Sequence, residues 1–263
     1  MAKQKKTICI ISSFYNEREN LKKFILSFDK TKDVLSKQGY NVILAMVNDG
    51  STDTSINIVK RLKIKKKYIK IISLTKNYGQ QIAIFTAIKM IDADFYGAID
   101  SDGQQDPKFF IKMLNDLNKE NLDIVQMKKK YGNYEGFTKK LFSKFFYYIF
   151  SSFTNINLQP GSSDFYLFTK KVRSEIISSN ISKFFLRGFI HWTGFPKKNL
   201  EYLPSRRTSG VSKYNAYKQI DFALTAIYLY GTKLFVKLFI FSALIMFLSL
   251  SFILFIIFDK IFL

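Results

Sequence analysis

The chain has 263 residues and a formal net charge of +21 at pH 7. Its length suits one sizeable α/β domain with an appendage. The positive charge favours anionic partners such as acidic lipid headgroups or phosphorylated small molecules. Dispersed lysines are usually solvated, so charge alone is weak evidence for nucleic acid, and we expect no nucleic-acid partner. A single cysteine, Cys9, excludes an intrachain disulfide and a cysteine-based zinc site.

Short apolar runs alternate with helical patterns through the first half of the chain. We expect strands at residues 7–14, 41–48, 68–74, 95–100 and 122–127, and helices at 17–37, 54–66, 79–91 and from Pro107 onward. Nearly continuous apolar strands separated by helices are typical of a mostly parallel sheet with helices on both faces. The expected fold class is therefore α/β and Rossmann-like.

The second half of the chain has a less regular pattern. From residue 132 we expect an aromatic-rich helix and then a turn at "NLQPGSSD", followed by a strand at 165–169, a helix up to residue 179, and an irregular stretch from 184 to 214. Residues 214–233 have a helical pattern in which Tyr and Phe accompany isolated charges. That pattern is typical of a helix that lies at a membrane surface.

Residues 238–258 form an apolar run without a charge. As an α-helix this run would cover roughly 30 Å, the thickness of a bilayer core. A buried core helix is the alternative, but such helices rarely lack polar residues on every face. We therefore expect a transmembrane helix in the inner, cytoplasmic membrane, with the lysine-rich body on the cytoplasmic face. The expected divisions are a body at 1–213, an interfacial region at 214–233 and a membrane segment at 234–263.

Polar motifs follow four of the expected strands at the point where each strand ends. They are "SFYNEREN", "NDGSTDTS", "LTKNYGQQ" and "DSDGQQDP", in chain order. Each motif alone has an ordinary explanation, because such residues form turns and helix caps. Ligands of doubly wound sheets bind beyond the carboxyl ends of the strands, so four such motifs at one edge predict a binding site.

Asp100 and Asp102 lie two residues apart on an extended stretch, where both can reach a divalent cation. Mg²⁺ or Mn²⁺ typically takes one or two carboxylates, and substrate phosphates and water complete its shell. A calcium loop is excluded, because its glycine and glutamate positions hold Gln105 and Ile111. A carboxylate pair for glycoside hydrolysis stays open, but it leaves the motifs after the first two strands unexplained.

Asp106 and His191 have simpler structural interpretations. Asp106 is expected to cap the helix that begins near Pro107. His191 is the single histidine of the chain, so a histidine base would have to be this residue, but packing beside Trp192 is the simpler expectation. The sequence has no Walker or G-x-G-x-x-G phosphate loop.

The order of the four motifs, continued by "SDFYLF", "FLRGFIHWTGF" and "RRTSGVSKY", resembles the family 2 glycosyltransferases. The resemblance extends from about Thr7 to Tyr214 and is closest to the dolichol-phosphate mannose synthase and polyprenyl-phosphate glycosyltransferase group. It implies a GT-A-like catalytic domain that transfers a hexose-type sugar, with inversion, from a nucleotide-diphosphate sugar to undecaprenyl or dolichyl phosphate. The implied partners are this donor, this lipid acceptor and the membrane; homo-oligomerisation stays open.

The resemblance also implies roles for individual residues. The residues implied in donor binding are Ser13, Tyr15, Glu17, Asp49 and Asp100. The implied ligands of Mg²⁺ or Mn²⁺ are Asp100, Asp102 and Gln104. Those implied in binding the acceptor phosphate are Lys128, Arg187, Arg207 and Lys213, and those implied in catalysis are Asp102, Asp164, Arg207 and Lys213.

Three positions depart from the family pattern. Ser13 replaces a proline, Asn48 replaces the usual first acid, and Lys128 stands where an arginine is common. Lysine lacks the planar fork that binds phosphate in a bidentate manner, which puts that mode of binding at Lys128 in doubt. None of the three changes removes a charge needed at the metal.

Two other functions stay open at this point. A related transferase acting on a sugar hydroxyl would need a general base, for which Asp164 is the candidate, whereas a lipid phosphate is already anionic. Asp164 could instead orient the acceptor or the metal. A membrane-anchored basic binding module would need neither Asp100 nor Asp102 and would bind with a steep salt dependence.

Overall fold

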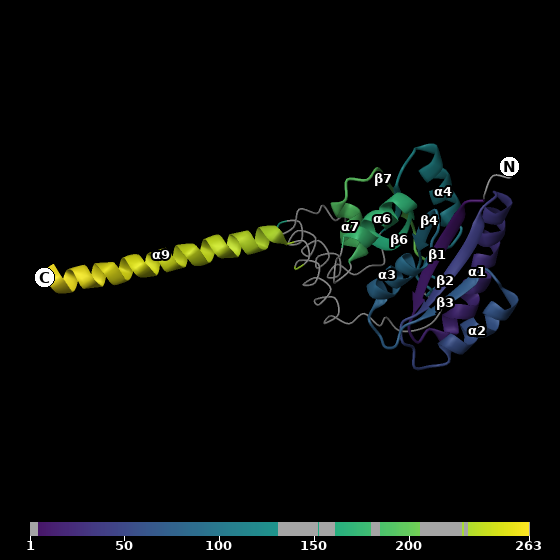
Figure 1. Ribbon diagram of the computed structural model, residues 1–263, viewed down its shortest axis with the longest axis horizontal. Helices are drawn as coiled ribbons and strands as arrows, with labels where there is room; N and C mark the ends of the chain where they lie inside the picture. Colours follow the sequence, from purple (N-terminus) through teal and green to yellow (C-terminus); the bar gives the residue numbers. More distant parts are fainter. Residues whose placement is uncertain are drawn as a thin grey trace.

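The computed structural model describes residues 5–130, 152, 161–179, 185–205, 228 and 231–262. Within these residues, a seven-stranded sheet has the order β3-β2-β1-β4-β6-β5-β7. Helices cover both faces of this sheet, and the C-terminal helix projects away from the body (Figure 1). The α/β, mostly parallel fold class expected from the sequence is confirmed.

The first half of the chain supplies four parallel strands and four helices that pack against the sheet. Its elements are β1 (Thr7–Phe14), α1 (Arg18–Lys37), β2 (Asn41–Asn48), α2 (Ser55–Lys65), β3 (Ile69–Ser73), α3 (Gln80–Met90), β4 (Phe95–Ala98) and α4 (Phe109–Lys119). β1 pairs in parallel with both β2 and β4, and β2 pairs in parallel with β3. Every element expected in this half is confirmed, with ends that move by two residues or fewer.

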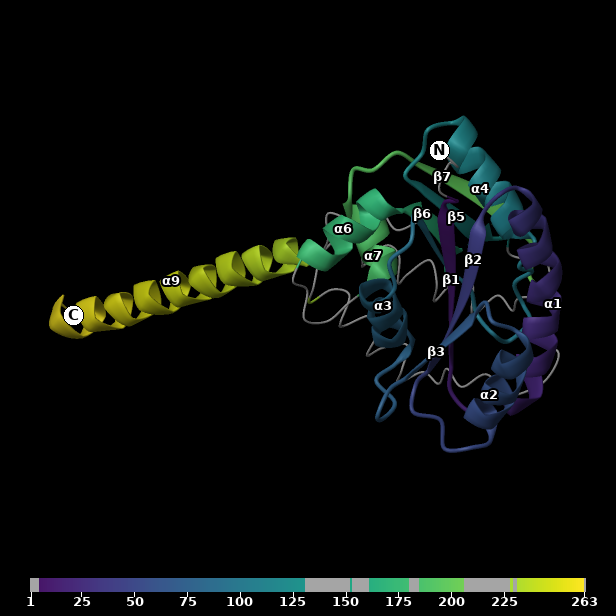
Figure 2. The ribbon, with the colours of Figure 1, turned by 45° about the vertical axis from the view of Figure 1, so that its right-hand side comes forward.

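Two apolar cores, one on each face, hold the layers together. On one face α1, α2 and α4 bury side chains such as Phe28, Val59 and Phe110. On the other face α3 and the two helices of the second half bury Ile84 and Phe189. The helices of the two layers lie on opposite sides of the strands in both views (Figures 1 and 2). The strands are apolar on both sides because both sides are covered.

The second half of the chain adds β5 (Ile124–Lys129), β6 (Ser162–Thr169), α6 (Lys170–Ser178), α7 (Leu186–Trp192) and β7 (Lys197–Tyr202). The expectation of an irregular stretch from 184 to 214 is wrong for α7 and β7. α7 has only seven residues, too few to show a helical repeat in the sequence. In β7 only the fourth and sixth residues are buried, and the strand begins with two lysines. Its sequence therefore lacks the apolar run by which the other strands were predicted.

β6 runs antiparallel to β4 and to β5, whereas β7 is parallel to β5. Tyr166 of β6 lies opposite Ala98, the last residue of β4. The first residues of β6 therefore reach the same edge of the sheet as the carboxyl ends of the parallel strands. This edge includes the topological switch point, because the chain passes from β1 to β2 on one side and returns to β4 on the other.

α9 (Thr232–Phe262) contains the apolar run at 238–258. By length and composition, Leu234–Ile261 within it could cross a membrane, with a mean hydropathy of 2.8 and no part buried against the protein. Among the described residues nothing buries this helix, which favours the membrane-spanning expectation over a buried core helix. The helices expected from residue 132 and at 214–233 lie almost entirely outside the described residues, and so does the boundary expected after residue 213.

Candidate functional site

The loops that follow β1 and β2 are joined by hydrogen bonds at the switch-point edge. Asn16 adopts a left-handed conformation, with φ of 52°. Its Oδ1 accepts the N–H of Thr52 at 2.9 Å, and its own N–H donates to the hydroxyl of Ser51 at 3.1 Å. The N–H of Glu17 donates to the hydroxyl of Ser55 at 2.9 Å. These side chains fix the two loops against each other without any ligand.

Asp49 anchors the loop that leads into α3. Its carboxylate is 3% exposed and accepts the backbone N–H groups of Tyr78 at 2.8 Å and Gly79 at 3.0 Å. Burial raises the pKa of Asp49, and these two hydrogen bonds oppose that rise. Next to it, Gly50 has φ of +67°, and a Cβ there would lie 2.4 Å from the carbonyl carbon of Lys76. Asp49 is thus engaged within the protein, and its role in donor binding stays a prediction.

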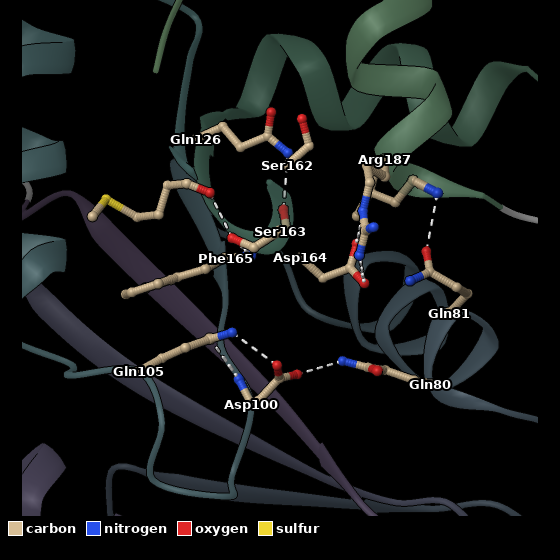
Figure 3. A network of polar contacts seen from close by, with 12 residues as sticks. Gln80, Gln81, Asp100, Gln105, Gln126, Ser162, Ser163, Asp164, Phe165 and Arg187 are labelled. Atoms are coloured by element: carbon tan, nitrogen blue, oxygen red, sulfur yellow. Dashed lines mark hydrogen bonds and ion pairs between the residues drawn. The ribbon is translucent and has the colours of Figure 1, made fainter. Parts of the chain in front are cut away.

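Asp100 lies at the end of β4, between two glutamine side chains (Figure 3). Its Oδ1 accepts the amide N–H of Gln80 at 2.6 Å, and its Oδ2 accepts that of Gln105 at 2.8 Å. Burial, followed by the negative charges of Asp102 and Asp164, raises the pKa of Asp100 to about 7. Three carboxylates therefore lie close enough to influence one another, and the charge of Arg187 partly offsets their repulsion.

The two other acids of the "DSDGQQDP" motif form turns. Asp102 Oδ1 accepts the N–H of Gln104 at 3.0 Å, and the carbonyl of Gln104 accepts the N–H of Ser205 at 3.0 Å. Asp106 Oδ1 accepts the N–H of Lys108 at 2.9 Å. Asp106 therefore caps the turn that leads directly into α4, in line with the expectation, although the helix itself begins at Phe109 and not at Pro107.

Asp164 and Arg187 form a bidentate ion pair between β6 and α7 (Figure 3). Nη2 of Arg187 lies 2.8 Å from Oδ2 of Asp164, and Nε donates to Oδ1 at 3.3 Å. The Asp164 side chain is 9% exposed and that of Arg187 is 21% exposed. Asp164 and Arg187 were both predicted as site residues. They are 23 residues apart in the chain, and the fold brings them into direct contact.

His191 has a more specific contact than packing beside Trp192. Its Nε2 lies 3.0 Å from Oε1 of Gln126, whereas the Trp192 ring contacts Phe189. Burial, followed by the charges of Lys197 and Arg187, lowers the pKa of His191 to about 4. The imidazole is therefore neutral at pH 7.

The remaining predicted residues divide into two groups. Ser13, Tyr15 and Lys128 are partly exposed at the same edge of the sheet, and Lys128 lies opposite Ser162 in the β5–β6 ladder. The carbonyl of Ser13 accepts the hydroxyl of Ser101 at 3.3 Å. Arg207 and Lys213 lie outside the described residues, so their roles stay predictions.

Several glutamines of the site were not predicted from the sequence. Gln80 and Gln105 hold Asp100, and Gln126 holds His191. The glutamine pairs in "NYGQQ" and "DSDGQQDP" were the available signal, since two adjacent amides after a strand end can bind an acid from either side. Gln126 gave no signal, because it stands alone within an apolar strand.

A divalent cation fits the donor atoms at this edge. Within the described parts of the chain, no three His, Cys, Asp or Glu side chains form a metal-binding group. Asp100 and Asp102 nevertheless provide hard carboxylate oxygens, and the charge of Asp102 contributes, after burial, to the raised pKa of Asp100. Mg²⁺ and Mn²⁺ commonly bind to one or two carboxylates with phosphate oxygens and water, so this pair fits a cation that arrives with its substrate.

Comparison with known proteins agrees with this geometry. The chain is 29% identical over 224 residues to the uncharacterized glycosyltransferase YkcC of Bacillus subtilis, covering 85% of this chain and 68% of that protein. It is 25% identical over 225 residues to the bactoprenol glucosyl transferase of Shigella phage SfV, covering 86% of this chain and 72% of the relative.

A solved structure with a similar fold is glucosyl-3-phosphoglycerate synthase from Mycobacterium tuberculosis, in complex with Mn²⁺, UDP-glucose and phosphoglyceric acid. It has a TM-score of 0.54 and 15% identity, covering 84% of this chain and 79% of that one. At this identity the likeness shows the fold alone, which is the GT-A-like fold expected from the sequence. Residues 9–179, more than half of the chain, match the family described as glycosyl transferase family 2. The chain therefore belongs to glycosyl transferase family 2.

Proposed function

We propose that the protein is a membrane-bound, metal-dependent transferase that moves a hexose-type sugar from a nucleotide-diphosphate sugar to a polyprenyl phosphate. The observation that carries this proposal is the position of the Asp164–Arg187 pair within reach of the charge of Asp100 at the switch-point edge. A metal-assisted donor site and a cation suited to an acceptor phosphate then lie next to each other. The name of the bactoprenol glucosyl transferase relative supports a polyprenol-type acceptor.

On the donor side, Asp100 and Asp102 would hold Mg²⁺ or Mn²⁺, with Gln104 near them in the same turn. The ion, when bound, stabilises the negative charge that develops on the leaving diphosphate. Gln80 and Gln105 keep the Asp100 carboxylate in place, and each of its oxygens retains capacity for a further contact. Ser13, Tyr15 and Glu17 would line the nucleoside end of the donor.

On the acceptor side, Arg187 would bind the lipid phosphate, with Lys128 at the same edge and Arg207 and Lys213 as further predicted contacts. A guanidinium binds phosphate oxygens in a bidentate manner. The acceptor oxygen is already anionic, so no base is required to activate it. Asp164 accepts two hydrogen bonds from Arg187, which engage both of its carboxylate oxygens and favour an orienting role. This arrangement supports a phosphate acceptor over a sugar hydroxyl.

The apolar helix α9 would keep the catalytic domain at the surface where a polyprenyl phosphate presents its headgroup. One described helix has the length and composition for this purpose. By the positive-inside rule, the lysine-rich domain would remain on the cytoplasmic face. The acceptor would then reach the site by diffusion in two dimensions.

The test is an assay of the full chain in detergent with a panel of nucleotide sugars, polyprenyl phosphate, and Mg²⁺ or Mn²⁺. We expect a lipid-linked sugar with one class of donor. Absence of that product with every donor would contradict the proposal. Transfer to a glycan or glycolipid hydroxyl that Asp164→Asn abolishes, with donor binding retained, would instead support the hydroxyl-acceptor alternative.

A further inference from the structure

β6 is irregular at the point where it supplies Asp164. Gln126 of β5 lies opposite Tyr166, and Lys128 lies opposite Ser162, so four steps along β6 correspond to two along β5. Ser163 and Asp164 belong to this bulge. A bulge changes the direction of a side chain and removes regular ladder hydrogen bonds, so the freed backbone groups need other partners.

Two side chains provide those partners. The hydroxyl of Ser163 donates to the carbonyl of Met127 at 2.5 Å. The amide nitrogen of Gln126 donates to the carbonyl of Ser163 at 2.8 Å (Figure 3). Gln126 is 2% exposed, so losing either of its hydrogen bonds would leave a buried polar group unsatisfied. Gln126 therefore holds the bulge from inside the sheet.

The other end of Gln126 fixes the tautomer of His191. The carbonyl of Ser163 can only accept, so Nε2 of Gln126 faces it and Oε1 faces His191. Oε1 in turn can only accept, so Nε2 of His191 carries the proton in the 3.0 Å hydrogen bond. The hydroxyl of Ser162 lies 3.4 Å from the same Nε2 and then acts as a second acceptor. Because burial keeps His191 neutral, its Nδ1 is then unprotonated.

The same helix presents His191 and Arg187 one turn apart, so both lie on one face of α7. At the start of α7, the N–H of Leu186 donates to Oε1 of Gln81 at 3.0 Å. α7 is thus attached to α3 at one end and to Gln126 at the other, with Arg187 between the two attachments. Gln126 holds both partners of the ion pair: Asp164 through the bulge and Arg187 through the helix.

We propose that Gln126 and His191 are positioning residues that set the bidentate geometry of the Asp164–Arg187 pair and so orient the acceptor phosphate. The second part of this inference rests on the proposed function, whereas the first concerns the ion pair alone. Neither Gln126 nor His191 needs to touch the substrate. Their loss would allow α7 to shift relative to the bulge, and a small displacement of a positioning group is enough to weaken a site.

The kinetic test uses Gln126→Leu, which keeps the approximate shape of the side chain and removes both hydrogen bonds. We expect the KM for polyprenyl phosphate to rise about tenfold, while the KM for the nucleotide sugar stays unchanged. His191→Leu should have the same effect, and the double variant should be no worse than either single variant, because both break one chain of contacts. His191→Gln keeps an N–H donor of similar reach and should restore most of the acceptor affinity.

Tyr96→Phe is the matched control for lost stability. The Tyr96 hydroxyl is also buried on this face of the sheet, where it accepts the N–H of Ala93 and donates to the carbonyl of Ile91, away from the site. This variant should leave both KM values unchanged. An equal rise in the acceptor KM for Tyr96→Phe, or a rise in both KM values for Gln126→Leu, would overturn the positioning role.

A spectroscopic test separates this inference from the proposed function. His191 is the single histidine, so ¹⁵N-histidine labelling of the full chain gives one pair of ring-nitrogen signals. We expect the Nε2–H tautomer in the wild type and a tautomer mixture in Gln126→Leu. In a second sample labelled with ¹⁵N-arginine we expect faster solvent exchange of the Arg187 Nε–H, assigned with Arg187→Lys. Unchanged spectra would refute the inference. If the wild type transfers no sugar to polyprenyl phosphate, the proposed function is wrong, and these spectra alone decide whether the residues position the pair.

Discussion

The ends of β1, β2 and β4 differ from the β6–α7 region in how their polar side chains are satisfied. In the first region, Asn16, Asp49 and Asp102 bind backbone N–H groups, whereas Asp100 is held by two glutamine side chains. In the second region, Asp164 and Arg187 bind each other through their side chains. A backbone N–H cannot leave its acceptor without moving the loop, whereas an arginine can exchange a carboxylate for a phosphate. The first region is therefore a rigid frame, and the second contains contacts that a ligand can replace.

This difference assigns separate tasks to the two regions. A nucleotide diphosphate with its metal needs fixed oxygen ligands, because Mg²⁺ demands near-ideal geometry. A lipid phosphate that enters and leaves as a different molecule needs a cation that can change partner. Variants in the first region should therefore affect donor use or stability, and variants in the second should affect acceptor use.

The largest expected effect is that of Asp102→Asn in the rigid frame. Transfer should fall by about 10³-fold, because one of the two carboxylates proposed to hold the metal is lost. Asparagine retains an oxygen that can accept the Gln104 N–H, so the melting temperature should change little. The measurement is the initial rate of sugar transfer at saturating Mn²⁺, with removal of the metal by a chelator as a parallel arm.

Asp106→Asn is the control for this experiment, since Asp106 makes the same kind of turn four residues later. Its rate should stay within about twofold of the wild type, as is usual for a surface substitution. A rate for Asp102→Asn above one tenth of wild type would contradict the proposed metal site.

Gly50→Ala should produce the next largest effect, on stability. The new Cβ would meet backbone atoms of Lys76 and Asn77 at 2.4–2.7 Å, and φ of +67° disfavours any side chain. We expect a loss of about 3 kcal/mol in the free energy of unfolding. Gly39→Ala provides the contrast, because Gly39 also has a positive φ but no atom within 4 Å, and about 1 kcal/mol is expected. Equal melting temperatures for the two variants would show that the loops are not held rigidly.

The same contrast between regions explains what the sequence could predict. The first region follows from one rule: polar motifs that end apolar parallel strands meet at one edge. That rule places Asp49, Asp100 and Asp102 together. It does not place Asp164, because this residue stands near the start of a strand and reaches the edge only because β6 runs antiparallel. Strand direction depends on pairing between distant segments, for which the local pattern of β6 gives no signal.

The contacts around α7 were hidden for a related physical reason. The Arg187–Asp164 and His191–Gln126 contacts span 23 and 65 residues, respectively. An amide such as Gln126 has no charge and no preferred motif, so its role appears only when its neighbours are in place. The resemblance to glycosyltransferases identified Arg187 and Asp164 as candidates, but not that they bind each other.

Arg187→Lys tests the replaceable contact of the second region. Lysine keeps the charge and loses the bidentate fork, so the KM for polyprenyl phosphate should rise about tenfold with an unchanged KM for the donor. Arg173→Lys is a suitable control, because Arg173 lies on α6 and donates to the carbonyl of Ile88 at 2.9 Å, outside the site. A higher donor KM in Arg187→Lys would mean that the two regions do not divide donor and acceptor as proposed.

The smallest expected effect is a pH dependence of stability that originates in the second region. His191 has a folded pKa of about 4, below the ordinary value of 6.5. Between these values the unfolded chain binds more protons at this site, so the stability due to neutral His191 is complete above pH 6.5 and is lost as the pH falls toward 4. Asp49 and Asp100 have raised pKa values and contribute slopes of the opposite sign. The loss attributable to His191 should be on the order of 1–2 kcal/mol.

His191→Gln cannot titrate, so its melting temperature should fall less than that of the wild type between pH 7 and pH 4.5. Parallel curves for the two proteins would mean that His191 is not held neutral against Gln126. The His191–Gln126 contact would then not fix α7, and the second region would have no rigid support for the replaceable Arg187–Asp164 contact.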